Sequence, residues 1–177
     1  MDKKPGSLNQ VNFLHVVVGI CGMLKVGETA PDFSLFNAGM ESVTLSQFKG
    51  KHNVVLFFYA KDGTPSCTQE AIEFSDLDDQ FRRHHTVVFG ISRDDCIRHA
   101  QFRDKQGLAV DLLADEDGEV SKQFGVWTEI EKDGMRKPCV ARSTFVIDKR
   151  GVVRCALEVS NPKGHAHEVL RLVKEFS

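Results

Sequence analysis

The sequence predicts an α/β fold with a mixed central sheet flanked by helices, and three features lead to this expectation. Continuous apolar runs over 54–59 and 86–91 are typical of strands that are buried on both faces of a sheet. Between these runs, apolar side chains recur at helical spacing, which predicts a helix over 66–83. Farther along, the turn sequence Asp148-Lys149-Arg150-Gly151 separates two further apolar segments, 143–147 and 152–159, which predicts a hairpin. Strand–helix–strand alternation followed by a hairpin is typical of layered α/β domains.

The other elements follow in order along the chain. An N-terminal β-hairpin is expected from 32–36 and 41–45, with its turn at 37–39. Residues 92–94 can cap a helix that ends near Gly107, because glycine is favoured just after a helix. A short strand over 110–114, a short helix from 115 towards 124 and an amphipathic helix near the C-terminus complete the pattern.

The composition fits one globular domain and excludes some classes of partner. The chain has 177 residues, of which 41% are apolar and 27% charged, and it shows no repeat or linker. A formal net charge of −2 gives no electrostatic reason to expect nucleic acid or an anionic membrane as a partner. Its five cysteines are odd in number and form no CxxC pair, which is typical of reduced thiols in the cytoplasm.

The N-terminal residues are expected to lie outside the domain. An apolar stretch over 11–24 follows two lysines, but Asn12 and His15 interrupt it and it is too short to span a bilayer. We therefore expect residues 1–22 to be a disordered or loosely docked extension and 23–177 to be the domain. The lysines and the apolar stretch leave export open as an alternative to the cytoplasm.

The strongest chemical signal is a single cysteine placed just after a predicted buried strand. A short polar loop connects the run 54–59 to Cys67, in what is expected to be the first turn of a helix, and Thr64 lies three residues earlier. Unpaired backbone N–H groups and the helix dipole favour thiolate over thiol at such a position. This arrangement predicts a sulfur nucleophile.

The segment 58–68, FYAKDGTPSCT, resembles the peroxidatic-cysteine motif of peroxiredoxins, Pro-x-x-x-Thr/Ser-x-x-Cys. Further segments are similar to the bacterioferritin-comigratory, or PrxQ, branch of that family: 26–33, 90–94, 112–115 and 142–148. The resemblance implies a thioredoxin-like fold and the reduction of hydrogen peroxide and organic hydroperoxides, for antioxidant defence. It further implies thioredoxin or a similar thiol as reductant, no cofactor, and a monomer or weak homodimer.

In this chemistry the Cys67 thiolate attacks a peroxide oxygen and becomes a sulfenic acid. A thiol with a pKa of about 8.5 is about 3% thiolate at pH 7, so a lower pKa can raise the rate at most about 30-fold. Any larger acceleration requires hydrogen-bond donors aimed at the transition state. The resemblance implies that Thr64 orients thiolate and peroxide and that Arg142 stabilises both.

Two positions depart from the family pattern. Ala60 stands seven residues before Cys67, where the motif has proline, which shields the sulfur and fixes the loop. A resolving cysteine is expected five or 36 residues after the nucleophile, where this chain has Ile72 and Arg103. Cys96, 29 residues on, and Cys139 stay open as resolving thiols, beside a one-cysteine cycle completed by an external thiol.

Two other functions are alternatives to peroxide reduction. A thiol–disulfide oxidoreductase needs a second thiol on the same turn, but Thr64 and Glu70 occupy the positions three residues before and after Cys67. A redox sensor without turnover stays an alternative, because of Ala60 and the absent resolving positions. The pairs His84-His85 and His165-x-His167 lack metal-site spacing, so we expect solvated histidines and no metal.

Overall fold

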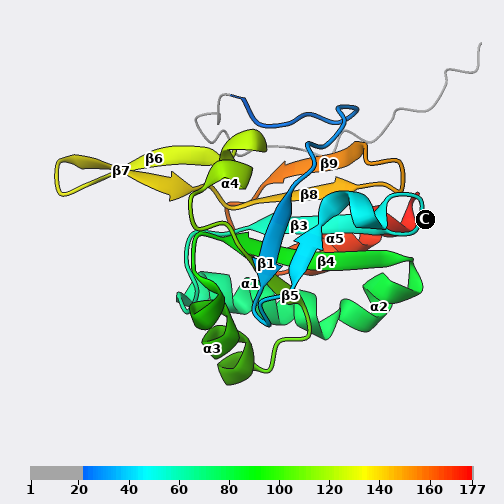
Figure 1. Ribbon diagram of the computed structural model, residues 1–177, viewed down its shortest axis with the longest axis horizontal. Helices are drawn as coiled ribbons and strands as arrows, with labels where there is room; N and C mark the ends of the chain where they lie inside the picture. Colours follow the sequence, from blue (N-terminus) through cyan, green and yellow to red (C-terminus); the bar gives the residue numbers. More distant parts are fainter. Residues whose placement is uncertain (1–21, 177) are drawn as a thin grey trace, which may run out of the picture.

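The computed structural model describes residues 22–176 and contains a seven-stranded sheet in the order β2-β1-β5-β4-β3-β8-β9 (Figure 1). The predicted extension, 1–22, lies almost wholly outside the described residues, as does Cys21. The strands of this sheet are β1 Ser34–Asn37, β2 Ser42–Thr44, β3 Asn53–Phe58, β4 Thr86–Ser92, β5 Asp111–Ala114, β8 Ser143–Ile147 and β9 Val153–Glu158. β3, β4 and β5 run parallel while the others pair antiparallel, so the predicted mixed sheet is confirmed.

The helices are η1 Leu45–Phe48, α1 Pro65–Asp76, α2 Asp78–Arg83, α3 Cys96–Gln106, α4 Glu119–Gln123 and α5 His165–Lys174. The single helix expected over 66–83 is interrupted at Leu77, whose φ of −99° and ψ of 0° leave the helical region. Helical spacing of apolar residues runs through this position, so the pattern gives no sign of the break. The predicted helix ending at Gly107 is confirmed, with Asp95 rather than 92–94 as its cap.

Alternation along β3 divides the core into two layers. Val55, Phe57 and Tyr59 face a cluster to which α1, α2, α3 and α5 contribute. Val54, Leu56 and Phe58 face the other cluster, to which α4 and the N-terminal hairpin contribute. β3 is therefore buried on both faces, as its continuous apolar sequence predicts.

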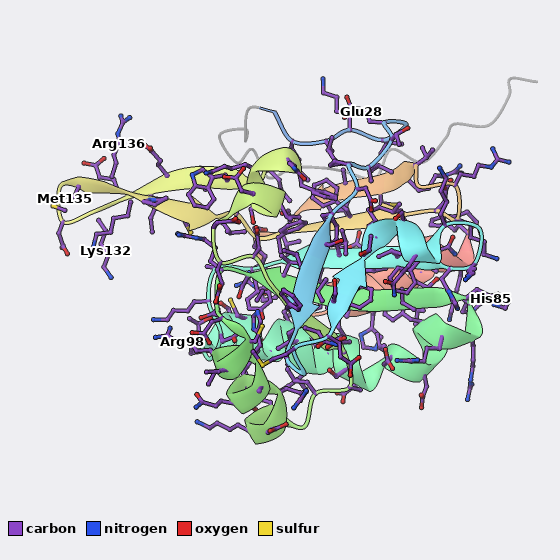
Figure 2. All side chains as sticks on the ribbon, viewed as in Figure 1. Glu28, His85, Arg98, Lys132, Met135 and Arg136 are labelled. Atoms are coloured by element: carbon purple, nitrogen blue, oxygen red, sulfur yellow. The ribbon has the colours of Figure 1, made fainter. Side chains whose placement is uncertain are left out.

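A two-stranded hairpin was not expected from the sequence. β6 Trp127–Lys132 and β7 Met135–Val140 pair antiparallel and extend away from the sheet (Figure 1), with Lys132, Met135 and Arg136 at the far end (Figure 2). Most of their residues are exposed, so the segment carries no apolar face for a periodicity argument. The Asp133-Gly134 turn, with φ of 54° and 73°, was the available signal.

Candidate active site

Cys67 is placed by the connection between β3 and α1. The loop leaves β3 at Phe58, turns at Gly63 with a φ of +81°, and enters α1 with Pro65 as the first helical residue. Proline is favoured there, because the first N–H of a helix has no partner to lose. Cys67 is the third residue of the helix and only 2% exposed. The expected position in the first helical turn is confirmed.

Strand pairing explains how Arg142 reaches this cysteine from 75 residues away. β8 pairs antiparallel with β3, and Phe58 lies opposite Ser143. Arg142 immediately precedes β8, so it lies beside the point where the loop to Cys67 leaves β3. Its guanidinium Nη2 lies 3.3 Å from Cys67 Sγ and donates to Ser66 Oγ at 2.8 Å.

Glu70 completes this group, and sequence reasoning assigned it no role. It lies one turn after Cys67 in α1, is 1% exposed, and accepts a hydrogen bond from Arg142 Nη1 on Oε2. Its other oxygen, Oε1, is buried without a hydrogen-bond partner among the described residues. The i, i+3 spacing from Cys67 was a signal that could have identified it.

Burial disfavours the charged forms of both Glu70 and Arg142, while their mutual attraction favours them. Burial raises the pKa of Glu70 to about 7, although the neighbouring Arg142 charge acts against this. Burial by itself would lower the pKa of Arg142, but Glu70 and Cys67 raise it by more, so the guanidinium stays charged. The site therefore holds a fixed cation against the sulfur, where negative charge lies before and during an attack on peroxide.

The remaining candidate residues are Thr64 and the two possible resolving thiols, Cys96 and Cys139. The Thr64 hydroxyl donates to the Lys61 carbonyl at 3.3 Å, so its role in orienting a peroxide stays a prediction. Cys96 is the first residue of α3, and burial, with the carboxylates of Glu116 and Asp95, raises its pKa. Burial also raises the pKa of Cys139, and there the charge of Cys67 contributes.

His165 corrects an expectation from the sequence, because it is buried rather than solvated. Its side chain is 6% exposed and its Nε2 lies 2.8 Å from the Thr144 hydroxyl. Burial, helped by the charge of Arg142, lowers its pKa to about 4, so the imidazole is neutral at pH 7. Residues 22–176 contain no group of three or more His, Cys, Asp or Glu side chains arranged to hold a metal. In the same residues no helix is long and apolar enough to cross a membrane.

Comparisons with known proteins agree with this geometry. The sequence model of the AhpC/TSA family matches residues 26–156. Peroxiredoxin Bcp from Bacillus subtilis is 36% identical over 154 residues, which cover 87% of this chain and 98% of the relative. Peroxiredoxin Bcp from Escherichia coli is similar to the same extent, with 36% identity and coverage of 87% and 98%.

Solved structures similar to this chain come from the same family. A cysteine-to-serine mutant of Xylella fastidiosa PrxQ superimposes with a TM-score of 0.81 at 32% identity, over 87% of this chain and 98% of that one. A Xanthomonas campestris bacterioferritin comigratory protein, described for its alkyl peroxide reduction activity, gives 0.77 at 33% identity, over 81% and 90%. The expected thioredoxin-like fold is confirmed by these neighbours.

Proposed function

Because this chain belongs to the AhpC/TSA family, as a peroxiredoxin of the Bcp/PrxQ group, we propose that Cys67 is the nucleophile with which it reduces hydroperoxides. The family establishes the activity, thiol-dependent peroxide reduction, and the structure supplies the candidate residues. One observation supports the choice of Cys67 above all: its sulfur is buried in the first turn of α1, 3.3 Å from the Arg142 guanidinium.

In the proposed reaction the thiolate attacks one peroxide oxygen. A sulfur–oxygen bond forms as the oxygen–oxygen bond breaks, and the leaving oxygen takes a proton to become water or an alcohol. Arg142 stabilises the negative charge that spreads from the sulfur to the two oxygens. Thr64 orients the peroxide by accepting a hydrogen bond from the peroxide O–H, while the Thr64 hydroxyl keeps donating its own hydrogen bond to the Lys61 carbonyl.

The proposed substrates are hydrogen peroxide and organic hydroperoxides. The alkyl peroxide reduction ascribed to the Xanthomonas campestris relative supports the organic class. A single buried cysteine beside one guanidinium selects for the O–O group rather than for the rest of the molecule. We therefore expect both classes to react at Cys67.

The cycle is completed by a thiol, and we propose that this thiol is external, supplied by thioredoxin or a similar reductant. Cys96 has a raised pKa and so a smaller thiolate fraction with which to attack the sulfenic acid. We further propose that the protein acts as a monomer or weak homodimer in the cytoplasm. An odd number of cysteines without a CxxC pair supports that compartment.

One experiment tests both the nucleophile and the resolving step. The reduced protein is treated with one equivalent of hydrogen peroxide, with and without dimedone, and its peptides are mapped by mass spectrometry. We expect dimedone on Cys67 and no disulfide from Cys67 to Cys96 or Cys139. A Cys67 disulfide with either residue would replace the one-cysteine cycle by a two-cysteine cycle. Oxidation confined to other cysteines would contradict the choice of Cys67.

A further inference from the structure

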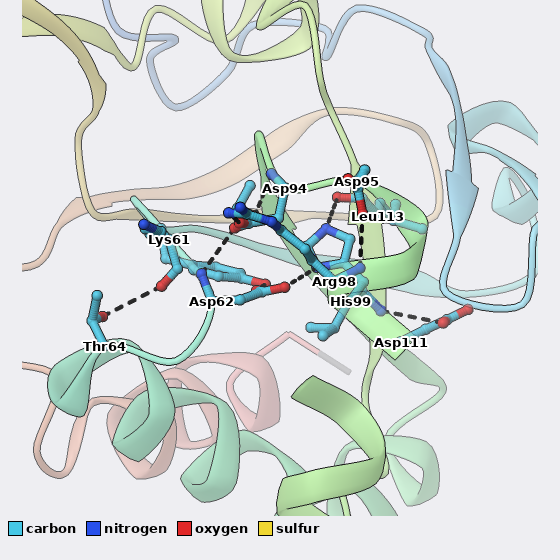
Figure 3. Close-up of polar contacts among 12 residues, drawn as sticks. Lys61, Asp62, Thr64, Asp94, Asp95, Arg98, His99, Asp111 and Leu113 are labelled. Carbon is cyan, nitrogen blue, oxygen red and sulfur yellow. Dashed lines mark hydrogen bonds and ion pairs between the residues drawn. The ribbon is translucent and has the colours of Figure 1, made fainter. Parts of the chain in front are cut away.

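A buried histidine contacts a carboxylate that belongs to the loop leading to Cys67. His99, in α3, has a side chain with no exposed surface, and the Asp62 side chain is 7% exposed. His99 Nδ1 lies 2.7 Å from Asp62 Oδ2, as Figure 3 shows. A buried pair of this kind is costly to form unless its remaining polar atoms are also satisfied.

Both ring nitrogens of His99 face oxygen acceptors. Nε2 lies 3.1 Å from the Leu113 carbonyl in β5, and a carbonyl can only accept. Nδ1 faces the carboxylate of Asp62, so each ring nitrogen has an oxygen partner. The histidine thus connects β5, α3 and the loop through side-chain bonds.

Asp62 is held on its other oxygen as well. Tyr59, the residue that follows β3, donates a hydrogen bond from its hydroxyl to Asp62 Oδ1 at 2.6 Å. Burial, with the charge of Asp62, raises the pKa of Tyr59, so the phenol keeps the proton that it donates. Each carboxylate oxygen of Asp62 therefore has a partner of its own, Tyr59 at Oδ1 and His99 at Oδ2.

The loop backbone has an anchor of its own. The N–H of Asp62 donates to Asp94 Oδ2 at 2.8 Å, and the same oxygen accepts from the Ser92 hydroxyl at 2.7 Å. Arg98, in α3 and four residues after Asp94, lies 3.6 Å from the other oxygen of that carboxylate. Asp94 is 7% exposed, so the anchor point lies in the body of the protein rather than on its surface.

These bonds lie next to the residue assigned to orient the peroxide. The Thr64 hydroxyl donates to the carbonyl of Lys61. This carbonyl and the Asp62 N–H belong to the same peptide group. A peptide unit is planar, so fixing that N–H also fixes the carbonyl. Alanine at position 60 leaves φ free where the motif has proline, so the start of the loop depends on such bonds.

We propose that His99 is a positioning residue, which acts through Asp62 to hold the loop 60–64 and thereby Thr64 in the geometry needed for peroxide attack. The proposal rests on the proposed role of Cys67 as nucleophile. It predicts that breaking the His99–Asp62 bond harms the reaction with peroxide more than the reactivity of the sulfur itself. Breaking that bond should leave the contacts of Arg142 with Cys67 and Glu70 intact, because these residues lie in α1 and next to β8.

The test compares two reactions of Cys67 in single-turnover experiments: oxidation by hydrogen peroxide and alkylation by iodoacetamide. We expect His99→Leu and Asp62→Ala to slow oxidation about 10- to 100-fold, as a misplaced reacting group does. Alkylation, which needs no oriented peroxide, should change less than about threefold. His99→Asn, whose amide can take the place of Nδ1, should keep most of the oxidation rate.

Thr86→Val serves as the matched control, because it removes a buried hydrogen bond between Asn53 and Thr86 at the far end of β3 and β4. Its oxidation rate should equal that of the wild type. Asp62→Ala removes the same contact from the loop and leaves α3 unchanged, so it carries the test if His99→Leu fails to fold. Unchanged oxidation in Asp62→Ala, or equal slowing of oxidation and alkylation, would overturn the positioning role alone. A wild type that does not react with peroxide at Cys67 would overturn the proposed function with it.

Discussion

Replacing Arg142 with methionine is expected to slow the oxidation of Cys67 by hydroperoxide about 10²- to 10³-fold. That is the usual cost of removing one donor that stabilises developing negative charge in a transition state. Arg142 Nη2 lies 3.3 Å from the sulfur, so a cation is in hydrogen-bonding contact with the reacting atom. Methionine keeps much of the length of the side chain but supplies neither charge nor N–H donor. Single-turnover oxidation of the purified variant measures the effect.

A second variant separates chemistry from stability. Arg142→Met leaves Glu70 buried without its partner, and breaking a buried pair in this way costs about 3–5 kcal/mol of stability. Combining Arg142→Met with Glu70→Gln removes that unpaired charge, so the double variant should regain stability. Its oxidation rate should stay low. If the rate recovers together with the stability, Arg142 acts by holding the fold and not by stabilising the transition state.

The pH dependence of stability should change strongly when Glu70 is replaced with glutamine. Burial raises the pKa of this carboxyl from 4.5 to about 7, despite the opposing charge of Arg142. A folded-state value above the unfolded one contributes stability that is full below about pH 4.5 and is lost as the pH rises through about 7. The loss amounts to about 3 kcal/mol. Glu70→Gln should remove this contribution from the pH profile of stability, as measured by urea unfolding between pH 4.5 and 8.

His165 contributes to the pH dependence of stability in the opposite direction and offsets the contribution of Glu70 in the wild type. Burial lowers its pKa from 6.5 to about 4, so its contribution is full above about pH 6.5 and is lost as the pH falls through about 4. Between these limits the two contributions oppose each other. Glu70→Gln should therefore show stability rising with pH, and His165→Gln should show it falling. His167→Gln, exposed in the same helix, should follow the wild type. A Glu70→Gln profile parallel to that of the wild type would contradict the burial of an ionisable carboxyl at this position.

The elements that the sequence predicted well are those whose burial leaves a periodic pattern. β3 and β4 are continuous apolar runs, and the C-terminal helix has a strong apolar face. The hairpin of β6 and β7 was missed, because its exposed, mostly polar residues bury no face of their own. The break at Leu77 was missed for the opposite reason, since that side chain is buried and keeps helical spacing.

Prediction of the site was limited by contacts between residues far apart in the sequence. Local sequence was enough to place Cys67 in the first turn of a helix. The meeting of Arg142 with Cys67 depends on the register of β3 against β8, which no local pattern specifies. Asp62 and His99 are separated by 37 residues, and a single histidine in a helix carries no signal of a partner. Family resemblance indicated Arg142, but the contacts of Glu70 and His99 depend on how distant segments pack in the fold.

The claim that Cys67 carries the peroxidase activity is tested most directly by following peroxide consumption with thioredoxin, thioredoxin reductase and NADPH. Wild-type protein and Cys67→Ser are compared at equal concentration, with Cys96→Ser and Cys139→Ser as matched controls. We expect continuous consumption by the wild type and by both controls, and none above background by Cys67→Ser. Undiminished turnover by Cys67→Ser would contradict the account. Absence of turnover by the wild type with any thiol donor would contradict it as well.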